Sequence, residues 1–355
     1  MIPVGNSPSQ PPRPRPAAAS PDWRLAWRAA VRDPRELLAM LGLESLAGRI
    51  GPQAAQSFPL RVPRGFVARM RHGDPGDPLL RQVLPLDDEG RIVPGFVPDA
   101  VGDAAARRGD GLIHKYQGRA LLVATGSCAV HCRYCFRRHY PYAEEAAAAA
   151  GWRGAVAAIA ADPSIVEVIL SGGDPLSLAD HKLAELTQAL GEVPHVRRLR
   201  IHTRLPIVLP ERVDDGLTAW LRGLPWPVVV VLHANHANEF DPQVAAAVAA
   251  LRDAGAFVLN QAVLLRGVND SVEALAELCE RGFEAGVLPY YLHQLDRVAG
   301  AAHFEVGDDE ALALHAALAA RVPGYLLPRL VREVAGDPGK RALAPAWTPP
   351  PPSCN

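Results

Sequence analysis

The sequence predicts an α/β protein whose parallel strands and helices alternate to form an open, partial TIM-like (β/α)6 barrel. From residue 119 onward, short β-branched runs recur, and helix-like segments lie between them. This alternation is typical of parallel βαβ units. Polar or glycine-rich residues follow each run, as expected where the strand ends of such folds form a binding site. A flat, doubly wound sheet is the alternative architecture.

The strands are expected where the β-branched runs lie, at residues 119–125, 166–170, 196–201, 227–232, 256–265 and 287–292. The helices are expected in the intervening segments, at residues 144–161, 178–190, 211–221, 241–255 and 271–286. Right-handed crossovers between such units curl the sheet into a barrel.

The chain is expected to have five parts. Residues 1–22 and 344–355 are proline-rich and predicted to be disordered. Residues 23–110 show helical spacing interrupted by prolines and are expected to form a mainly helical region. The barrel spans residues 111–305, and residues 306–343 form a C-terminal extension.

Composition excludes several classes of function. The net charge of −1 provides no basic field for nucleic acid. No apolar run is long enough to span a membrane, and the first residues lack the apolar core of a secretory signal. We therefore expect a cytoplasmic protein without nucleic-acid or membrane partners.

Three cysteines lie close together directly after the first predicted barrel strand: Cys128, Cys132 and Cys135. Thiolates select zinc, copper(I) or iron–sulfur clusters. A zinc site that used His131 or His139 as a fourth ligand is one alternative, and unligated core cysteines are another. Three thiolates on a [4Fe–4S] cluster leave one iron open, which provides a coordination site.

Lysine is rare in this chain, and one of its lysines lies at a position that suits a catalytic residue. Lys115, Lys182 and Lys340 are the lysines among 37 basic residues. Lys340 follows the barrel in a loop rich in glycine and proline, where neither helix nor strand is expected. Arginine cannot form a Schiff base, so Lys340 is a candidate for attack on an aldehyde such as pyridoxal phosphate (PLP). A solvated surface lysine is the alternative.

The cysteine spacing resembles the radical S-adenosylmethionine (SAM) superfamily. The pattern C-x3-C-x2-C follows the first strand, with Tyr134 before the last cysteine, and a GGDP turn follows the second strand. The resemblance implies a [4Fe–4S] cluster held by the three cysteines and chelated by SAM. It also implies that Gly172, Gly173 and Asp174 let the backbone approach the amino-acid part of SAM.

Further segments narrow the resemblance to the lysine 2,3-aminomutases, which use PLP as well: HKYQGRALLV, CFRRHYPY, HANHANE, NQAVLLRGVND, PYYLHQLD and a late GK. The match runs from about residue 23 to residue 343. By this resemblance, Lys340 is the catalytic lysine that binds PLP covalently. Lys115 and Arg119 hold the PLP phosphate.

The same resemblance assigns the contacts to the substrate, L-lysine. Arg137 matches the residue that binds its carboxylate, and Asp296 and Glu333 match the acidic pair that binds its ε-ammonium. A carboxylate side chain would be repelled by this pair, which disfavours a glutamate aminomutase.

Two departures, Glu333 in place of the usual Asp and the short C-terminal region, point to one branch of this family. In these two features the chain resembles the enzymes that make (R)-β-lysine for modification of elongation factor P. The R configuration rests on this resemblance. A catabolic aminomutase for free lysine, a radical SAM enzyme with another substrate, and a metal-binding scaffold without catalysis are the alternatives.

The resemblance also implies partners. An electron donor of flavodoxin or ferredoxin type reduces the cluster, and a functional link to an elongation factor P lysine ligase follows from the branch. A homo-oligomer is expected.

Overall fold

The computed structural model describes residues 22–109, 111–142 and 152–344. Within these residues, nine strands form one sheet in sequence order, from β1 to β9. Strands β2 through β8 pair in parallel, while β1 and β9 pair antiparallel with their neighbours at the two edges. No pairing among the described residues joins β1 to β9, so the sheet stays open.

The strands have these bounds: β1 Leu112–Tyr116, β2 Arg119–Thr125, β3 Glu167–Gly172, β4 Arg198–Thr203, β5 Val228–Leu232, β6 Phe257–Val263, β7 Leu288–His293, β8 Arg329–Arg332 and β9 Arg341–Ala342. The barrel helices are α6 Arg153–Ala161, α7 Asp180–Gly191, α8 Leu205–Val208, α9 Asp215–Arg222, α10 Pro242–Asp253, α11 Val272–Glu284 and α12 Asp308–Ala319.

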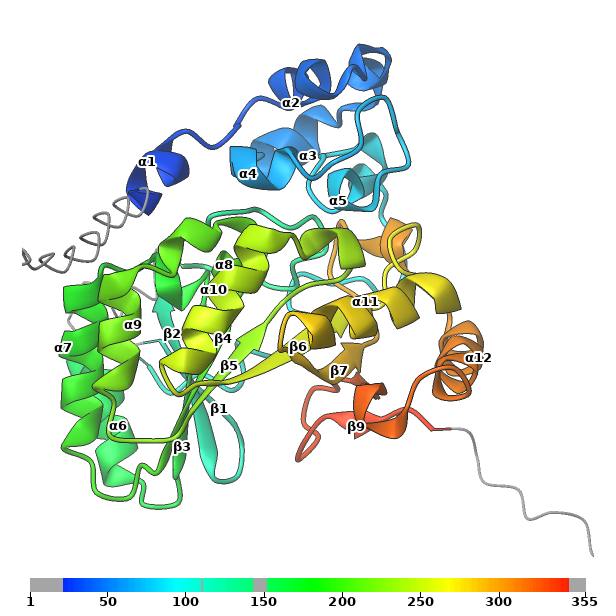
Figure 1. The fold of residues 1–355 in the computed structure, drawn as a ribbon. Coiled ribbons are helices and arrows are strands. Elements are labelled where there is room, and N and C mark those ends of the chain that lie inside the picture. Colours follow the sequence, from blue (N-terminus) through cyan, green and yellow to red (C-terminus); the bar gives the residue numbers. More distant parts are fainter. Residues whose placement is uncertain (1–21, 110, 143–151, 345–355) are drawn as a thin grey trace, which may run out of the picture.

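The strand order decides between the two predicted architectures. A doubly wound sheet reverses direction at a switch point, which places helices on both faces. Here each parallel strand lies beside the next one in the sequence, and right-handed crossovers in one direction put all connecting helices on the same face. Figure 1 shows α7, α9, α10 and α11 following one another along that face. The partial (β/α) barrel is confirmed, and the doubly wound sheet is wrong.

All six predicted strands are present, each within a few residues of its expected bounds. The five predicted helices are present too, although the first part of the segment 144–161 lies outside the described residues. Both predicted disordered ends also lie outside them, apart from one residue each.

Strand β8 and the hairpin that it forms with β9 were not predicted. Their register pairs Val331 with Ala342 and Arg332 with Arg341. Glu333 therefore leaves β8 directly opposite Lys340, which precedes β9. Lys340 does lie in a loop, as expected, but the loop is the turn of a hairpin.

The first part of the chain is built from short helices: α1 Trp23–Arg28, α2 Pro34–Leu41, α3 Pro52–Ser57, α4 Arg64–Val67 and α5 Pro78–Arg81, with 3-10 turns η1 Glu44–Arg49 and η2 Asp87–Gly90. Prolines start several of them, because a proline at the first helical position has no N–H that would need a partner. Figure 1 shows this group packed over one end of the barrel. It contacts the cysteine loop, since the amide of His131 donates to Arg61 O and that of Arg133 to Gln82 O.

The core runs along the sheet and under its helices. Buried side chains with almost no exposure lie on β2, β3, β4, β5 and β7, among them Leu122, Leu170, Ile201, Val230 and Leu292. The described helices include none that is both long and apolar enough to cross a membrane.

Candidate active site

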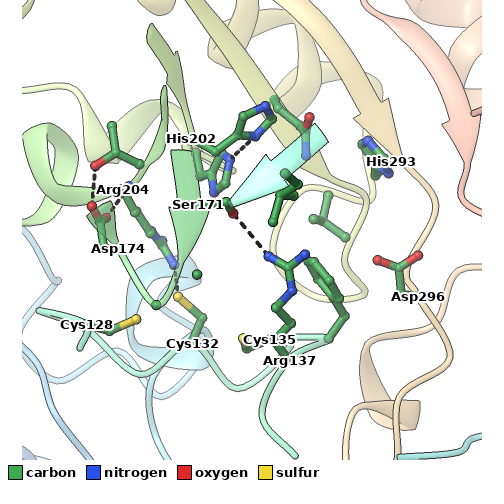
Figure 2. A pocket seen from close by; sticks show the side chains of 18 of the residues that line it. Cys128, Cys132, Cys135, Arg137, Ser171, Asp174, His202, Arg204, His293 and Asp296 are labelled. Atoms are coloured by element: carbon green, nitrogen blue, oxygen red, sulfur yellow. Dashed lines mark hydrogen bonds between the residues drawn. The ribbon is translucent and has the colours of Figure 1, made fainter. Parts of the chain in front are cut away.

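The predicted site residues meet in one cavity of about 440 Å³ at the carboxyl ends of the strands. Its lining includes every site residue predicted from the sequence: Lys115, Arg119, Cys128, Cys132, Cys135, Arg137, Gly172, Gly173, Asp174, Asp296, Glu333 and Lys340. Figure 2 shows the cysteine sulfurs on one side of the pocket and Asp296 and His293 on the other, with Arg137 between them. We call these two sides the cysteine end and the lysine end.

Buried charged side chains fix the loop that carries the three cysteines. Arg133, between two of the cysteines, is fully buried and pairs with Glu89 at 2.8 and 2.6 Å. Arg138 donates to the same carboxylate at 2.6 Å and to Arg133 O at 3.0 Å. A turn closed by the Cys135 amide on Cys132 O, at 3.0 Å, presents the sulfurs to the cavity. Glu89 belongs to η2, so the first part of the chain fixes the loop.

The donor set fits an iron–sulfur cluster better than a single ion. Burial raises the pKa of Cys135 to about 11 and that of Cys128 well above its usual value, so both are protonated thiols at neutral pH without a metal, and a metal that bound them would displace these protons. No group of three or more Cys, His, Asp and Glu among the described residues is arranged to hold one metal ion. Ligands of a cluster bind different irons and need not converge on one point.

The two histidines that could complete a zinc site are engaged elsewhere. His131 Nδ1 lies 2.7 Å from Pro59 O, and its ring stacks on Phe58 at 4.9 Å. His139 Nε2 lies 3.0 Å from Ala299 O. Each contact uses one ring nitrogen and leaves the other for a metal, and a histidine that binds zinc commonly donates its second N–H to a backbone carbonyl, so these contacts do not exclude a Cys3His site.

The GGDP turn packs against the strand that leads to the cysteines. A Cβ atom on Gly172, whose φ is +123°, would lie 2.4 Å from Thr125 O, and one on Gly173 would lie 2.4 Å from Ser127 O. Side chains are excluded at both positions because the backbones touch. The amides of Gly173 and Asp174 donate to those same two carbonyls, each at 2.7 Å.

The Asp174 carboxylate is used within the protein. It accepts from Thr203 Oγ1 and from the Arg204 amide, each at 2.7 Å, and from the Leu176 and Leu205 amides at 3.1 Å. Burial nevertheless raises its pKa to about 6, and the hydrogen bonds limit that rise. Asp174 therefore ties the turn after β3 to the end of β4.

At the lysine end, one carboxylate holds two amines. Glu333 accepts from Lys340 Nζ at 2.8 Å and from Lys115 Nζ at 3.0 Å. Burial alone would raise the pKa of Glu333, but Lys340 and then Lys115 lower it to about 2. The β8–β9 register makes the first contact, and β1 supplies the second lysine.

Asp103 joins this group to Arg137. Its carboxylate lies 2.6 Å from Lys115 Nζ and accepts from Arg137 Nε at 2.7 Å. Arg137 Nη1 also donates to Ser171 Oγ at 3.1 Å (Figure 2). The two cations beside Asp103 lower its pKa although burial opposes them. The guanidinium that faces the cavity is thus fixed from both sides.

Asp296 faces the same space from the loop after β7. Burial raises its pKa to about 7, with the charge of Glu333 adding to the effect. A cation that entered the cavity would lower this pKa and ionise the carboxyl group. Arg119 stacks its guanidinium over the Tyr116 ring at 4.7 Å.

Sequence reasoning missed several cavity residues. Asp103 is a lone acid in a region expected to be helical, and nothing in its neighbourhood marks it. His202, His233 and His293 do follow predicted strands, which was a usable signal. Burial lowers the pKa of each, to about 3 for His233, so the three rings are neutral.

The comparisons with known proteins identify the family of the chain. No family profile matches the chain. It is 49% identical to the L-lysine 2,3-aminomutase of Escherichia coli K12, over 91% of this chain and 94% of that protein. The L-lysine 2,3-aminomutase of Haemophilus influenzae is 43% identical, over 91% and 96%. That of Clostridium subterminale is 31% identical, over 92% and 78%.

One solved structure, a radical SAM methyltransferase from Sphaerobacter thermophilus, is 20% identical with a TM-score of 0.39, over 62% of this chain and 68% of that one. The sequence relatives alone decide the family. With nearly half of its residues identical over nine-tenths of its length to a named relative, this chain belongs to the L-lysine 2,3-aminomutase family.

Proposed function

We propose that the protein converts L-lysine to β-lysine by a radical mechanism. Cys128, Cys132 and Cys135 hold a [4Fe–4S] cluster at one end of the cavity, and Lys340 holds PLP at the other. The observation that carries the proposal is that all twelve residues expected from the resemblance line one cavity. A substrate placed between the two ends would meet both cofactors.

The cofactors supply the difficult chemistry: SAM on the reduced cluster yields the radical that removes a hydrogen atom from C3, and PLP lets the amino group move from C2 to C3. The protein has to hold the substrate so that only this hydrogen is reached. Arg137 can bind the carboxylate as a forked, two-point pair, and Asp103 and Ser171 fix its orientation.

The other end of the substrate carries an ammonium group. Asp296, whose pKa of about 7 leaves it ready to ionise beside a cation, is suited to bind it. Glu333 is shared between this role and its two lysines. Lys115 and Arg119 provide the positive charge for the PLP phosphate. Because Glu333 forms an ion pair with Lys340, it also holds the Lys340 amine in the cavity, where this amine would bind PLP.

The branch of the family is part of the proposal. The Escherichia coli and Haemophilus influenzae relatives are covered almost completely, whereas the Clostridium subterminale relative has about a fifth more chain. Glu333, at the position where aminomutases for free lysine usually have Asp, supports a role in supplying (R)-β-lysine for elongation factor P. A flavodoxin or ferredoxin would then supply the electron, and a β-lysine ligase would use the product.

The test is an anaerobic incubation of reconstituted protein with L-lysine, SAM, PLP and dithionite, followed by chiral chromatography. We expect (R)-β-lysine in excess over 5′-deoxyadenosine, because the hydrogen atom removed from C3 returns to the product. Cleavage of SAM without β-lysine would indicate a radical SAM enzyme with another substrate. β-Lysine of S configuration would contradict the elongation factor P role but not the aminomutase.

The cellular role needs its own measurement. In cells whose own gene for this enzyme is deleted, expression of the chain should restore the mass increase of elongation factor P that β-lysylation produces, whereas its Lys340→Arg variant should not. Free β-lysine that accumulated without modification of elongation factor P would support the catabolic alternative.

A further inference from the structure

Beneath the cysteine end, a buried polar network reaches one of the three sulfurs. Arg204, the first residue after β4, is 5% exposed and donates from Nη1 to Cys132 Sγ at 2.8 Å. The same Nη1 donates to Tyr134 Oη at 2.6 Å. Figure 2 shows the Arg204 side chain extended toward the sulfur of Cys132. A cationic group that donates to sulfur suits a thiolate better than a neutral thiol.

The position of Arg204 is determined on all sides. Its Nη2 donates to Gln82 Oε1 at 2.7 Å and to Glu239 Oε2 at 2.8 Å, and its own amide binds Asp174. Glu239 is completely buried. Gln82 caps α5, Glu239 ends the 3-10 turn Ala237–Glu239 that follows β5, and Asp174 belongs to the GGDP turn. The guanidinium therefore cannot swing away from Cys132 without leaving buried polar groups unpaired.

Tyr134 reaches the same sulfur. Its hydroxyl accepts from Arg204 Nη1 and from Asn235 Nδ2, the latter at 2.7 Å. Its oxygen is thus occupied as an acceptor, and its own hydrogen remains to be donated. Arg204 Nη1 donates both to this hydroxyl and to Cys132 Sγ, which places the sulfur beside the hydroxyl, and we assign the sulfur as the acceptor of its hydrogen. By this assignment Cys132 receives an N–H from Arg204 and an O–H from Tyr134.

We propose that Arg204 and Tyr134 are positioning residues that raise the reduction potential of the cluster through their hydrogen bonds to Cys132 Sγ. This inference rests on the proposed function, because it requires the cluster. Reduction adds one electron from an external one-electron donor to the [4Fe–4S]2+ form and gives the 1+ form, with no bond made or broken. Donors at a ligating sulfur and a nearby positive charge stabilise that added negative charge.

A purely structural role for Arg204 predicts something different. Its contacts with Glu239 and Gln82 form a buried ion-pair network, and loss of a partner from such a network destabilises folding. Stability alone does not distinguish the two roles. The midpoint potential does, because it depends on the electrostatics at the sulfur.

Three variants separate the effects. Arg204→Gln removes the charge and alters the donor, and Tyr134→Phe removes one hydroxyl while keeping the ring that packs on Phe304 at 6.3 Å. Arg212→Gln is the matched control. Arg212 is also fully buried and also paired with a carboxylate, Asp180 at 2.7 Å, but it does not line the cavity.

The measurement is an anaerobic redox titration with dithionite, monitored by the paramagnetic signal of the reduced cluster, together with iron content and unfolding temperature. We expect both Arg204→Gln and Tyr134→Phe to have more negative midpoint potentials than the parent, with the larger shift for Arg204→Gln. Arg212→Gln should unfold at lower temperature and keep the parent potential.

The outcomes distinguish this inference from the function on which it rests. A parent protein that binds no four-iron cluster would overturn the proposed function. A parent that loads the cluster, with Arg204→Gln and Tyr134→Phe at the parent potential, would overturn only the inference. Loss of the cluster in both variants would also overturn it, because their role would then be to build the site.

Discussion

The two ends of the cavity are built in different ways. The cysteine end is fixed by two kinds of contact. Gly173 lies against the backbone of Ser127, and Arg133 forms a deeply buried ion pair with Glu89. The lysine end is an array of charged side chains that share partners, with Glu333 between Lys340 and Lys115. A cluster needs ligands at constant positions, while an amine that exchanges partners needs charges that can be redistributed. The comparison predicts all-or-none effects at the first end and graded, pH-dependent effects at the second.

The largest effect is expected from the three cysteines. Cys128→Ala, Cys132→Ala or Cys135→Ala should each abolish a cluster of about four irons per chain, because each thiolate binds one iron. Iron and sulfide analysis after anaerobic reconstitution measures it. Cys279→Ala, a buried cysteine of α11 outside the cavity, should load iron as the parent does. One tightly bound zinc and no sulfide in protein purified without oxygen would contradict the cluster.

Lys340→Arg should come next. The variant keeps the charge beside Glu333 but cannot link PLP covalently, so borohydride should no longer fix PLP to the chain and β-lysine formation should collapse. The cluster should load normally, because the cysteines lie at the other end. Lys182→Arg is the control, since Lys182 makes an exposed contact with Glu185 on α7 and does not line the cavity. A Lys340→Arg protein that made β-lysine at the parent rate would make Lys340 an ordinary lysine.

A smaller loss is expected when the far contact to the substrate is weakened. Asp296→Asn should lower kcat/KM for L-lysine by a factor that corresponds to about 2–5 kcal/mol, since the substrate ammonium would lose a charged partner at a position where burial raises the pKa of the carboxyl group. Steady-state kinetics measure it, with the exposed Asp253→Asn as the control. If Asp296→Asn retained parent kcat/KM, the ammonium site would have to be elsewhere.

The parts of this comparison that could be predicted from the sequence follow a physical pattern. The six parallel strands β2 to β7 were predictable because they contain short apolar runs, of which the VVVVL of β5 is the most regular, and the loops at their carboxyl ends then place the cysteines and the GGDP turn together. Lys340 was identified because lysine is rare in the chain. Each of these signals can be read from the sequence without knowing which distant segments are in contact.

What could not be predicted depends on contacts between distant segments. Strand β8 is four residues long and flanked by arginines, so it lacks an apolar run. Asp103 is recognised as a site residue only through its contacts with Arg137 and Lys115. Arg204 is recognised only through Glu239 and Gln82, which lie 35 and 122 residues away. A single arginine in HTRLP looks like a solvated loop residue until the fold buries it.

The smallest expected effect is on stability, and it tests the graded character of the lysine end. The two acids there have opposite shifts. The pKa of Glu333 falls to about 2, so its contribution to stability is present above its ordinary value of 4.5 and is lost as the pH falls toward 2. The pKa of Asp296 rises from 3.8 to about 7, so the folded protein holds a proton that the unfolded chain releases, and stability decreases as the pH rises through that interval.

Asp296→Asn should remove the second dependence. In protein without substrate or cofactors, the variant and parent should have similar free energies of unfolding near pH 4, because Asp296 is then protonated in the fold. Above pH 7 the variant should be more stable by about 1–3 kcal/mol, since it carries no buried charge to ionise. Urea unfolding at pH 4, 6 and 8 measures the difference, and Asp253→Asn should show none of this trend. If the difference in free energy of unfolding between the parent and Asp296→Asn stayed constant with pH, Asp296 would already be ionised without substrate or cofactors. The charges of the lysine end would then be as fixed as the packing of the cysteine end.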